Sequence, residues 1–211
     1  GENDGSITNS YSTGAVSASS DVGGLVGENG YYGSILSSYS TGAVSGSSDY
    51  VGGLAGKNEG TLNNSYSWGM VSGSSYVGGS VGYNLRGDVI NCYSIAQVSG
   101  EGSYIGGLIG ENDLGTISNS YWDKEVSGQS SSGGGVGKTT AEMKKKATYV
   151  GWDFTSVWAI IEGETYPYLL WQSHSEIEGE GIHEGAIDGS QDGVNEGEGN
   201  DEGTNDGVHE G

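Results

Sequence analysis

The stretch Tyr39-Ser40-Thr41-Gly42-Ala43-Val44-Ser45 decides the fold, because its pattern returns along the chain. Tyrosine stands at positions 11, 39, 66, 93 and 121, at intervals of 28, 27, 27 and 28 residues. Valine follows each tyrosine after five residues and serine after six, ending with Val126 and Ser127. Four positions before each tyrosine lies an aliphatic residue: Ile7, Ile35, Leu62, Val89 and Ile117. Agreement at so many offsets identifies a tandem repeat.

The repeat unit favours strands over helices. The 211 residues include 43 glycines, and each glycine disfavours a helix by about 1 kcal/mol. Each repeat offers three short extended segments, as in 35–39, 43–46 and 50–56, separated by corners that contain glycine. One unit cannot bury its apolar face alone, whereas stacked units bury a continuous narrow core. We therefore predict an all-β fold, a parallel β-helix or β-solenoid of about five coils, for residues 1–138.

Stacking should place identical residues above one another, about 4.8 Å apart. We expect the tyrosines to stack ring on ring and one column of asparagines (Asn9, Asn64, Asn91 and Asn119) to hydrogen-bond along the stack, with Ser37 as an interruption. Cys92 stands in a column that is otherwise serine. As the only cysteine, it cannot form an intramolecular disulfide, and we interpret it as a small residue that replaces serine.

A second shared stretch begins at Gly-Gly pairs that start at positions 23, 52, 78 and 106. The segments Gly24-Leu25-Val26-Gly27-Glu28-Asn29, Gly53-Leu54-Ala55-Gly56-Lys57-Asn58 and Gly107-Leu108-Ile109-Gly110-Glu111-Asn112 resemble the GLUG motif. Ser80 replaces the leucine in the copy at Gly79-Ser80-Val81-Gly82, and the last copy is reduced to Gly134-Gly135-Val136-Gly137. GLUG repeats occur in large bacterial and archaeal surface proteins, including adhesin-like proteins and some IgA-cleaving metallopeptidases. The resemblance implies an extracellular or cell-surface repeat protein without an established chemistry of the motif itself.

Residues 139–172 do not follow the repeat pattern of residues 1–138 and are rich in aromatic side chains. Thr139 and Glu142 have the spacing of a capping box, which predicts a short helix over 139–147. Residues 157–161 and 168–171 read as strands around a turn at Glu162-Gly163. An open solenoid end exposes core and unpaired backbone, so we predict that 139–172 is a C-terminal cap. The alternative is an aromatic binding patch around Trp152 and Trp158.

Residues 173–211 contain no Lys, Arg, Phe, Trp or Tyr and repeat acidic residues next to glycine, as in Glu184-Gly185 and Asp188-Gly189. This composition predicts a disordered acidic linker or tether that binds divalent cations at most weakly and multivalently. The formal net charge of −21 disfavours nucleic acid as a partner. The chain offers no apolar run long enough to span a membrane. It also shows no signal peptide, and we expect any export signal to lie upstream of this piece.

The sequence offers little for catalysis. All three histidines (His174, His183 and His209) lie in the tail, and His183-Glu184 lacks the second histidine of an H-E-x-x-H zinc site. The segment Gly133–Thr139 has the wrong spacing for a phosphate-binding loop. Solenoid polysaccharide lyases and hydrolases use clustered carboxylates, whereas the acids of the body are scattered: Asp21, Glu28, Asp49, Glu59, Asp88 and Glu111. We predict no catalytic, cofactor or metal site in the body.

Two non-enzymatic hypotheses remain. The first is a structural and adhesive rod on an acidic tether, whose partner is a surface or matrix glycan or a protein. The second is a carbohydrate-binding module that uses a column of exposed tyrosines. Tyr50, Tyr76 and Tyr104 each precede a Gly-Gly pair by two residues and alternate with the inward Val51, Val77 and Ile105. These three tyrosines are the candidate ligand contacts, although they can equally stabilise one another.

Overall fold

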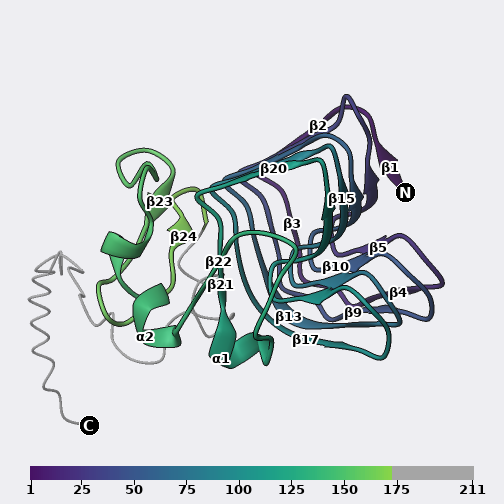
Figure 1. The fold of residues 1–211 in the computed structure, drawn as a ribbon. Helices are drawn as coiled ribbons and strands as arrows, with labels where there is room; N and C mark the ends of the chain where they lie inside the picture. Colours follow the sequence, from purple (N-terminus) through teal and green to yellow (C-terminus); the bar gives the residue numbers. More distant parts are fainter. Residues whose placement is uncertain (173–211) are drawn as a thin grey trace, which may run out of the picture.

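The computed structural model describes residues 1–172, which form a parallel β-solenoid with an aromatic segment packed on its side (Figure 1). The predicted fold class is therefore confirmed. The predictions of a disordered linker and of cation binding concern residues 173–211, which lie outside the described residues.

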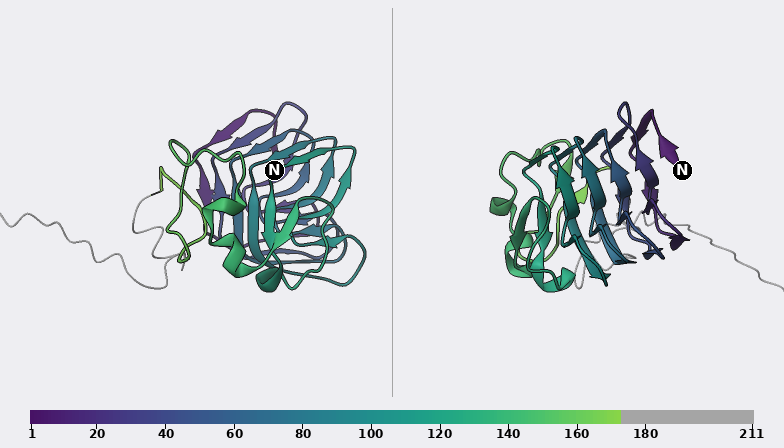
Figure 2. Two further views of the ribbon diagram at one scale, coloured as in Figure 1. Left: turned by 60° about the vertical axis from the view of Figure 1, so that its left-hand side comes forward. Right: turned by 45° about the vertical axis from the view of Figure 1, so that its right-hand side comes forward.

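Four parallel sheets run along the solenoid, and strands from successive turns lie side by side in each of them (Figure 2). Sheet A is β1 (Glu2–Asn3), β6 (Val26–Asn29), β11 (Ala55–Asn58), β15 (Val81–Leu85) and β19 (Ile109–Asp113). Sheet B is β2 (Ser6–Thr8), β7 (Ser34–Leu36), β12 (Thr61–Asn63), β16 (Asp88–Ile90) and β20 (Thr116–Ser118). Sheet D is β5 (Val22–Gly23), β10 (Val51–Gly52), β14 (Val77–Gly78) and β18 (Ile105–Gly106).

Sheet C holds the tyrosine and valine columns. It contains β3 (Tyr11–Ser12), β4 (Val16–Ala18), β8 (Tyr39–Ser40), β9 (Val44–Gly46), β13 (Tyr66–Gly73), β17 (Tyr93–Gly100), β21 (Tyr121–Asp123) and β22 (Val136–Lys138). Identical repeat positions face each other, for example Tyr66 with Tyr93 and Val71 with Val98. The register is thus the one that the repeat spacing predicts.

Four turns of the described chain pass through all four sheets, and the fifth leaves the solenoid after β21. Lys124–Ser127 form a one-turn helix, α1, whose N-cap is Asp123. Val126 and Ser127 therefore belong to a helix, not to a fifth strand, although they continue the repeat pattern in sequence. Asp123 accepts hydrogen bonds from the backbone N–H groups of Glu125 and Val126, and this cap redirects the chain.

The corners of each turn have left-handed backbone. One corner column is Asn9, Ser37, Asn64, Asn91 and Asn119, with φ between 46° and 51°. This column splits the predicted extended segment 35–39 into β7 and β8, so each of the first four turns has more strands than the three segments expected. Asparagine tolerates this backbone better than most residues, and this tolerance explains the column. The hydrogen-bonded asparagine ladder predicted here is wrong.

The asparagine ladder lies instead at the ends of the sheet A strands. Each side-chain Nδ2 donates to the Oδ1 of the next turn, from Asn3 through Asn29, Asn58 and Asn84 to Asn112, over 2.6–2.8 Å. The middle three side chains are fully buried. Buried amides must satisfy both donor and acceptor, and an uninterrupted column does so along the axis.

The interior is apolar and very narrow. Ile35, Leu62 and Val89 are fully buried, as are Leu54 and Leu108. The Gly-Gly pairs are needed for this closeness: a Cβ placed on Gly53 would lie 2.7 Å from Ser67 Cβ and 2.2 Å from the carbonyl oxygen of Gly79. Cys92 is buried in this core, in agreement with its interpretation as a small residue.

The tyrosine column faces outward and is covered by the segment 139–172. Tyr11, Tyr39, Tyr66 and Tyr93 stack with centroids 5.0–5.2 Å apart and planes within 10°. Three tryptophan indoles donate to the adjacent corner column: Trp171 to the Ser37 carbonyl, Trp158 to Asn64 Oδ1 and Trp152 to the Asn119 carbonyl. These contacts reach from the second turn to the fifth, so the segment runs back along the flank.

The prediction that 139–172 closes the end of the solenoid is therefore wrong, and we call this segment the lateral strap. The end is covered by the preceding glycines: a Cβ on Gly134 would lie 2.7 Å from Ile117 Cγ1, and one on Gly135 2.7 Å from Leu108 Cδ2. The shortened last motif copy thus lies directly on the core. Because Trp152 and Trp158 are buried in the strap interface, they do not form an open binding patch.

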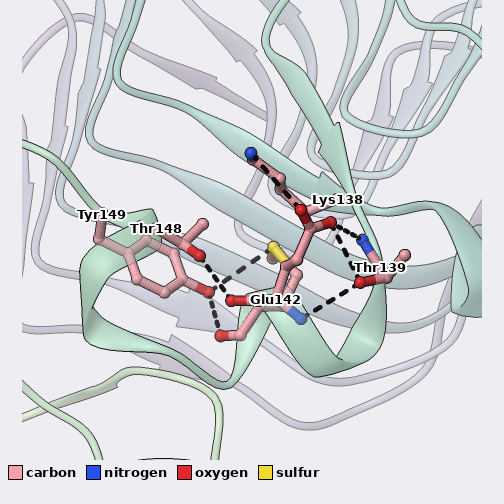
Figure 3. A network of polar contacts seen from close by, with 6 residues as sticks. Lys138, Thr139, Glu142, Thr148 and Tyr149 are labelled. Atoms are coloured by element: carbon pink, nitrogen blue, oxygen red, sulfur yellow. Dashed lines mark hydrogen bonds and ion pairs between the residues drawn. The ribbon is translucent and has the colours of Figure 1, made fainter.

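The strap begins with the predicted capping box (Figure 3). Thr139 Oγ1 accepts from the Glu142 N–H, and the Glu142 carboxylate accepts from the Thr139 N–H and lies 4.0 Å from Lys138 Nζ. The helix α2 (Thr140–Met143) is shorter than expected and is followed by the 3₁₀ turn η1 (Lys146–Thr148). The two predicted strands form an antiparallel pair, β23 (Trp158–Ala159) and β24 (Tyr168–Leu169).

Replacing Asn58 by aspartate should destabilise the solenoid by about 3 kcal/mol at neutral pH, because a buried carboxylate cannot donate to Asn84 Oδ1. The deficit should shrink as the pH falls, since a protonated carboxyl group regains a donor. Urea unfolding at pH 4.5 and 7.5 measures both effects. Asn9→Asp, at an exposed left-handed corner, is the matched control and should be nearly neutral.

Replacing Trp158 by alanine should cost about 3–5 kcal/mol of unfolding free energy, because the indole is fully buried between strap and tyrosine column. Chemical denaturation measures the loss. Val150→Ala, at a side chain that is 70% exposed, should leave stability unchanged. Equal stability of the Trp158 variant and the wild type would contradict the assignment of the strap as part of the folded unit.

Candidate functional site

The candidate residues Tyr50, Tyr76 and Tyr104 lie at one corner of the solenoid, just before the strands of sheet D. All three have left-handed backbone, with φ of 61°, 54° and 63°. Tyrosine in this region costs about 1–2 kcal/mol, so the corner is held by the surrounding stack. Asp21 has the same conformation in the first turn. The structure therefore brings the three predicted tyrosines together.

A fourth tyrosine, which the sequence analysis did not single out, joins them. The Tyr83 ring lies 5.3 Å from that of Tyr50 and 5.6 Å from that of Tyr76, and its hydroxyl lies 3.2 Å from Asp113 Oδ2. The signal was present: Gly82-Tyr83-Asn84 carries tyrosine where the other motif copies have Glu28, Lys57 and Glu111. We call Tyr50, Tyr76, Tyr83 and Tyr104 the tyrosine cluster.

Stacking decides which faces of the cluster are open. Tyr76 and Tyr104 stack with centroids 4.7 Å apart and an interplanar angle of 18°, and Tyr50 lies 5.0 Å from Tyr76. Rings stacked along the axis cover one another's faces, and a sugar needs a free face. Tyr50 and Tyr76 are half-buried, whereas Tyr104, the last ring of the column, is 48% exposed. A sugar stacked on this column would therefore use Tyr104.

The environment of Tyr76 and Tyr83 disfavours their ionised phenols. Partial burial is the largest of the causes that raise the pKa of Tyr76 above its ordinary value, and the neighbouring Tyr104 and Tyr50 raise it further. Burial and the hydrogen bond to Asp113 raise the pKa of Tyr83. Tyr76 and Tyr83 therefore stay neutral at physiological pH and offer rings and hydroxyl groups rather than phenolates.

A groove on sheet C is the second candidate. It has a volume of about 420 Å³ and is lined by Trp68, Gly69, Met70, Ile95, Gln97 and Val126. Ligand sites commonly have volumes of about 300–1,000 Å³, with mostly apolar walls and a few polar groups. Here the walls are apolar, and the exposed amide of Gln97 supplies the polar side chain.

This groove arises because the third and fourth turns depart from the repeat. Thr13 and Thr41 precede Trp68 in one column, and Ala15 and Ala43 precede Met70 in another. Met70 is 54% exposed, and Gly69 adopts a φ of +102° between the two large side chains. The sequence analysis missed this site because it followed what the repeats share. The available signal in the sequence was the replacement of threonine by Trp68 and of alanine by Met70 in the third turn.

The carboxylates of the body are engaged in other contacts or dispersed. Lys57 lies 2.9 Å from Glu28 and also bridges Glu59. Burial opposes the charge of Lys57, but hydrogen bonds with Glu59 and Glu28 outweigh it and raise its pKa. The buried Asp123 accepts from the hydroxyls of Thr140 and Tyr166, both over 2.7 Å, so it joins the strap to β21.

Within residues 1–172, no group of three or more His, Cys, Asp or Glu side chains is placed to hold a metal ion. None of the helices in this part of the chain is long and apolar enough to cross a membrane. The described residues therefore offer the tyrosine cluster and the Trp68 groove as candidate sites.

Replacing Asp113 by asparagine should lower the pKa of Tyr83 toward its ordinary value, because the hydrogen bond to a carboxylate and the repulsion by its charge both favour the neutral phenol. NMR titration of ring-labelled tyrosine measures this pKa. The pKa of Tyr76 serves as an internal control, since Asp113 is not among the causes of its shift. An unchanged Tyr83 titration would contradict the contact.

Comparison with known proteins agrees with this architecture. Residues 18–45 match the model of the GLUG motif. A search of curated proteins found no match. Among solved structures, the chain is similar to a crystal structure described as a "putative immunoglobulin A1 protease from Bacteroides ovatus", with 26% identity and a TM-score of 0.62. The match covers 80% of this chain and 58% of that one. The chain thus carries a GLUG motif within a β-solenoid that resembles the one in this Bacteroides protein.

Proposed function

We propose that residues 1–172 form a non-catalytic structural and adhesive module of an extracellular or cell-surface protein. The proposal rests on the contacts that the repeated asparagine and tyrosine side chains make. The asparagine column hydrogen-bonds to itself, and the tyrosine column of sheet C packs under the strap. Repetition in this chain thus serves the stiffness of the stack.

The name of the Bacteroides relative is that of an enzyme, and the matched region covers 58% of that chain. Two features support a scaffold role in this chain. His183-Glu184 is not followed by the histidine that a zinc peptidase helix requires. Glu28 and Glu59 are both paired with Lys57, which leaves these two carboxylates poorly suited to proton transfer.

The purified chain should therefore show no turnover of immunoglobulin, peptide or polysaccharide substrates. Product analysis by mass spectrometry after long incubation tests this expectation. The strongest contrary result would be a cleavage that disappears in one carboxylate variant, with Asp123→Asn excluded from that test because Asp123 joins strap and solenoid.

A second candidate function, glycan binding, is favoured by the groove beside Trp68. The indole there has no stacked ring partner among the described residues, unlike the rings of the tyrosine cluster. An indole face next to an amide suits a sugar ring, which presents C–H groups to the aromatic face and hydroxyls to the amide. Tyr104 is the competing platform.

A glycan array probed with the wild-type chain, Trp68→Ala and Tyr104→Ala distinguishes the two platforms. If the groove binds, Trp68→Ala should weaken binding at least about fivefold, since loss of one stacking contact costs about 1–3 kcal/mol, and Tyr104→Ala should have little effect. The reverse pattern would assign binding to the tyrosine cluster. Absence of any glycan signal would leave the scaffold role alone.

A further inference from the structure

The corner between each ladder asparagine of sheet A and the next strand of sheet B varies in length from turn to turn. It closes with two residues in the first and third turns, 4–5 and 59–60. The second turn uses four residues, 30–33, and the fourth and fifth turns use three each, 85–87 and 113–115. Since two residues suffice, the additional ones are not needed to close the turn. In repeat proteins such insertions often lie on the binding face.

The longer corners carry the most exposed large apolar side chains within residues 1–172. Tyr32, Leu114 and Tyr31 are 80%, 78% and 71% exposed. The two tyrosine rings meet edge to face, with centroids 5.0 Å apart. Leu114 has a left-handed backbone, with φ of 62°, which glycine or asparagine adopts with less strain. Because so little of Leu114 is buried, its side chain does not offset that strain within the fold, and this indicates a contact outside the chain.

Two charged side chains lie at the same corner, in the turns between these apolar groups. Arg86, the only arginine of the chain, is exposed and takes part in none of the ion pairs within residues 1–172. Glu59 shares Lys57 with Glu28. Two carboxylates around one ammonium group keep one negative charge, so this group can accept a further cation.

The corner residues follow one another in a fixed order along the axis. The Gly33 carbonyl accepts from the Thr61 N–H of the next turn, and the following corner glycines are joined in the same way, so the residues before these glycines form a column with a spacing of about 4.8 Å. From the second turn to the fifth, this column is Tyr32, Glu59, Arg86 and Leu114. We call these four residues, with Tyr31 beside Tyr32, the corner ridge.

The corner ridge is complementary to itself in reverse order. If a second copy lies antiparallel, with the two-fold axis between the third and fourth turns, Tyr32 faces Leu114 of the second copy. Glu59 then faces Arg86 of the second copy, and both contacts occur twice, as in any isologous interface. An axis through the third turn would oppose Glu59 to Glu59, and one through the fourth would oppose Arg86 to Arg86. Parallel packing would do both, so one register alone avoids like charges.

We infer that two copies of this chain associate through the corner ridge in this antiparallel register. The contact goes beyond the proposed function, because it needs no ligand and joins neighbouring copies of the module. The ridge is about 14 Å long, three spacings of about 4.8 Å. An interface of this size gives a weak, reversible dimer rather than an obligate one.

Sedimentation velocity of the full chain over a range of concentrations, at about 0.15 M salt, tests this dimer. Arg86→Glu and Glu59→Arg should each weaken association about tenfold or more, because each variant turns both ion pairs into like-charge contacts. An equimolar mixture of the two variants should associate again, since both pairs are complementary in the heterodimer. Glu59→Arg also lowers the net charge of −21, so general repulsion alone predicts a stronger dimer for that variant.

Two further variants separate the contact from net charge and from folding. Lys145→Glu, at an exposed lysine of the strap, changes the net charge as much as Arg86→Glu and should leave the dimer nearly unchanged. Leu114→Asp should weaken the dimer without loss of thermal stability, because aspartate tolerates the left-handed backbone. A wild-type chain that is monomeric up to about 1 mM, a dimer that Leu114→Asp and Arg86→Glu leave intact, or two charge variants that do not associate when mixed would each overturn the inference.

Discussion

Every residue of this solenoid must tolerate a copy of its own position about 4.8 Å away. Apolar residues, tyrosines and asparagines gain from that repetition, because they pack or hydrogen-bond with their equivalents. Like charges placed above one another destabilise the stack, since stacked carboxylates repel one another. In the column that begins with the paired acids Glu2 and Glu28, Lys57 comes next and forms an ion pair with Glu28, and Tyr83 then precedes Glu111. This constraint favours a solenoid rich in small and uncharged residues such as glycine and serine.

The shared repeat positions made the fold predictable. The tyrosine spacing gave the turn length and register, and the stacked rings follow directly. The choice between the two asparagine columns could not be made in the same way, because both recur with the period of the repeat and only Ser37 interrupts one of them. It depends on backbone: Ser37 and Asn64 bend the chain with positive φ, whereas Asn29 and Asn58 end strands with their side chains inward. Periodicity alone does not distinguish a corner from a ladder.

The strap was misassigned for a related reason. Composition identified 139–172 as a cover for apolar surface, and the sequence argument considered only the exposed ends of the stack. An outward column of tyrosines creates a second apolar surface along the flank, and Trp152, Trp158 and Trp171 contact the fifth, third and second turns beside it. The end of the solenoid needs no aromatic side chains to cover it, because the glycines at 134 and 135 allow the backbone to lie directly on the core.

The candidate binding sites lie at positions that do not repeat from turn to turn, and this affects how a ligand would bind. A repeated surface would present the same contact at every turn and bind by avidity. The Trp68 groove occurs once, because Met70 and Trp68 have small residues as counterparts in the first two turns. Tyr104 is likewise the end of its column. The rings that do repeat, such as Tyr39 and Tyr66, are buried under the strap. The repeated rings thus pack within the folded unit. The exposed exceptions, Trp68 and Tyr104, would each bind one ligand per module, so multivalency would have to come from several modules rather than from several turns.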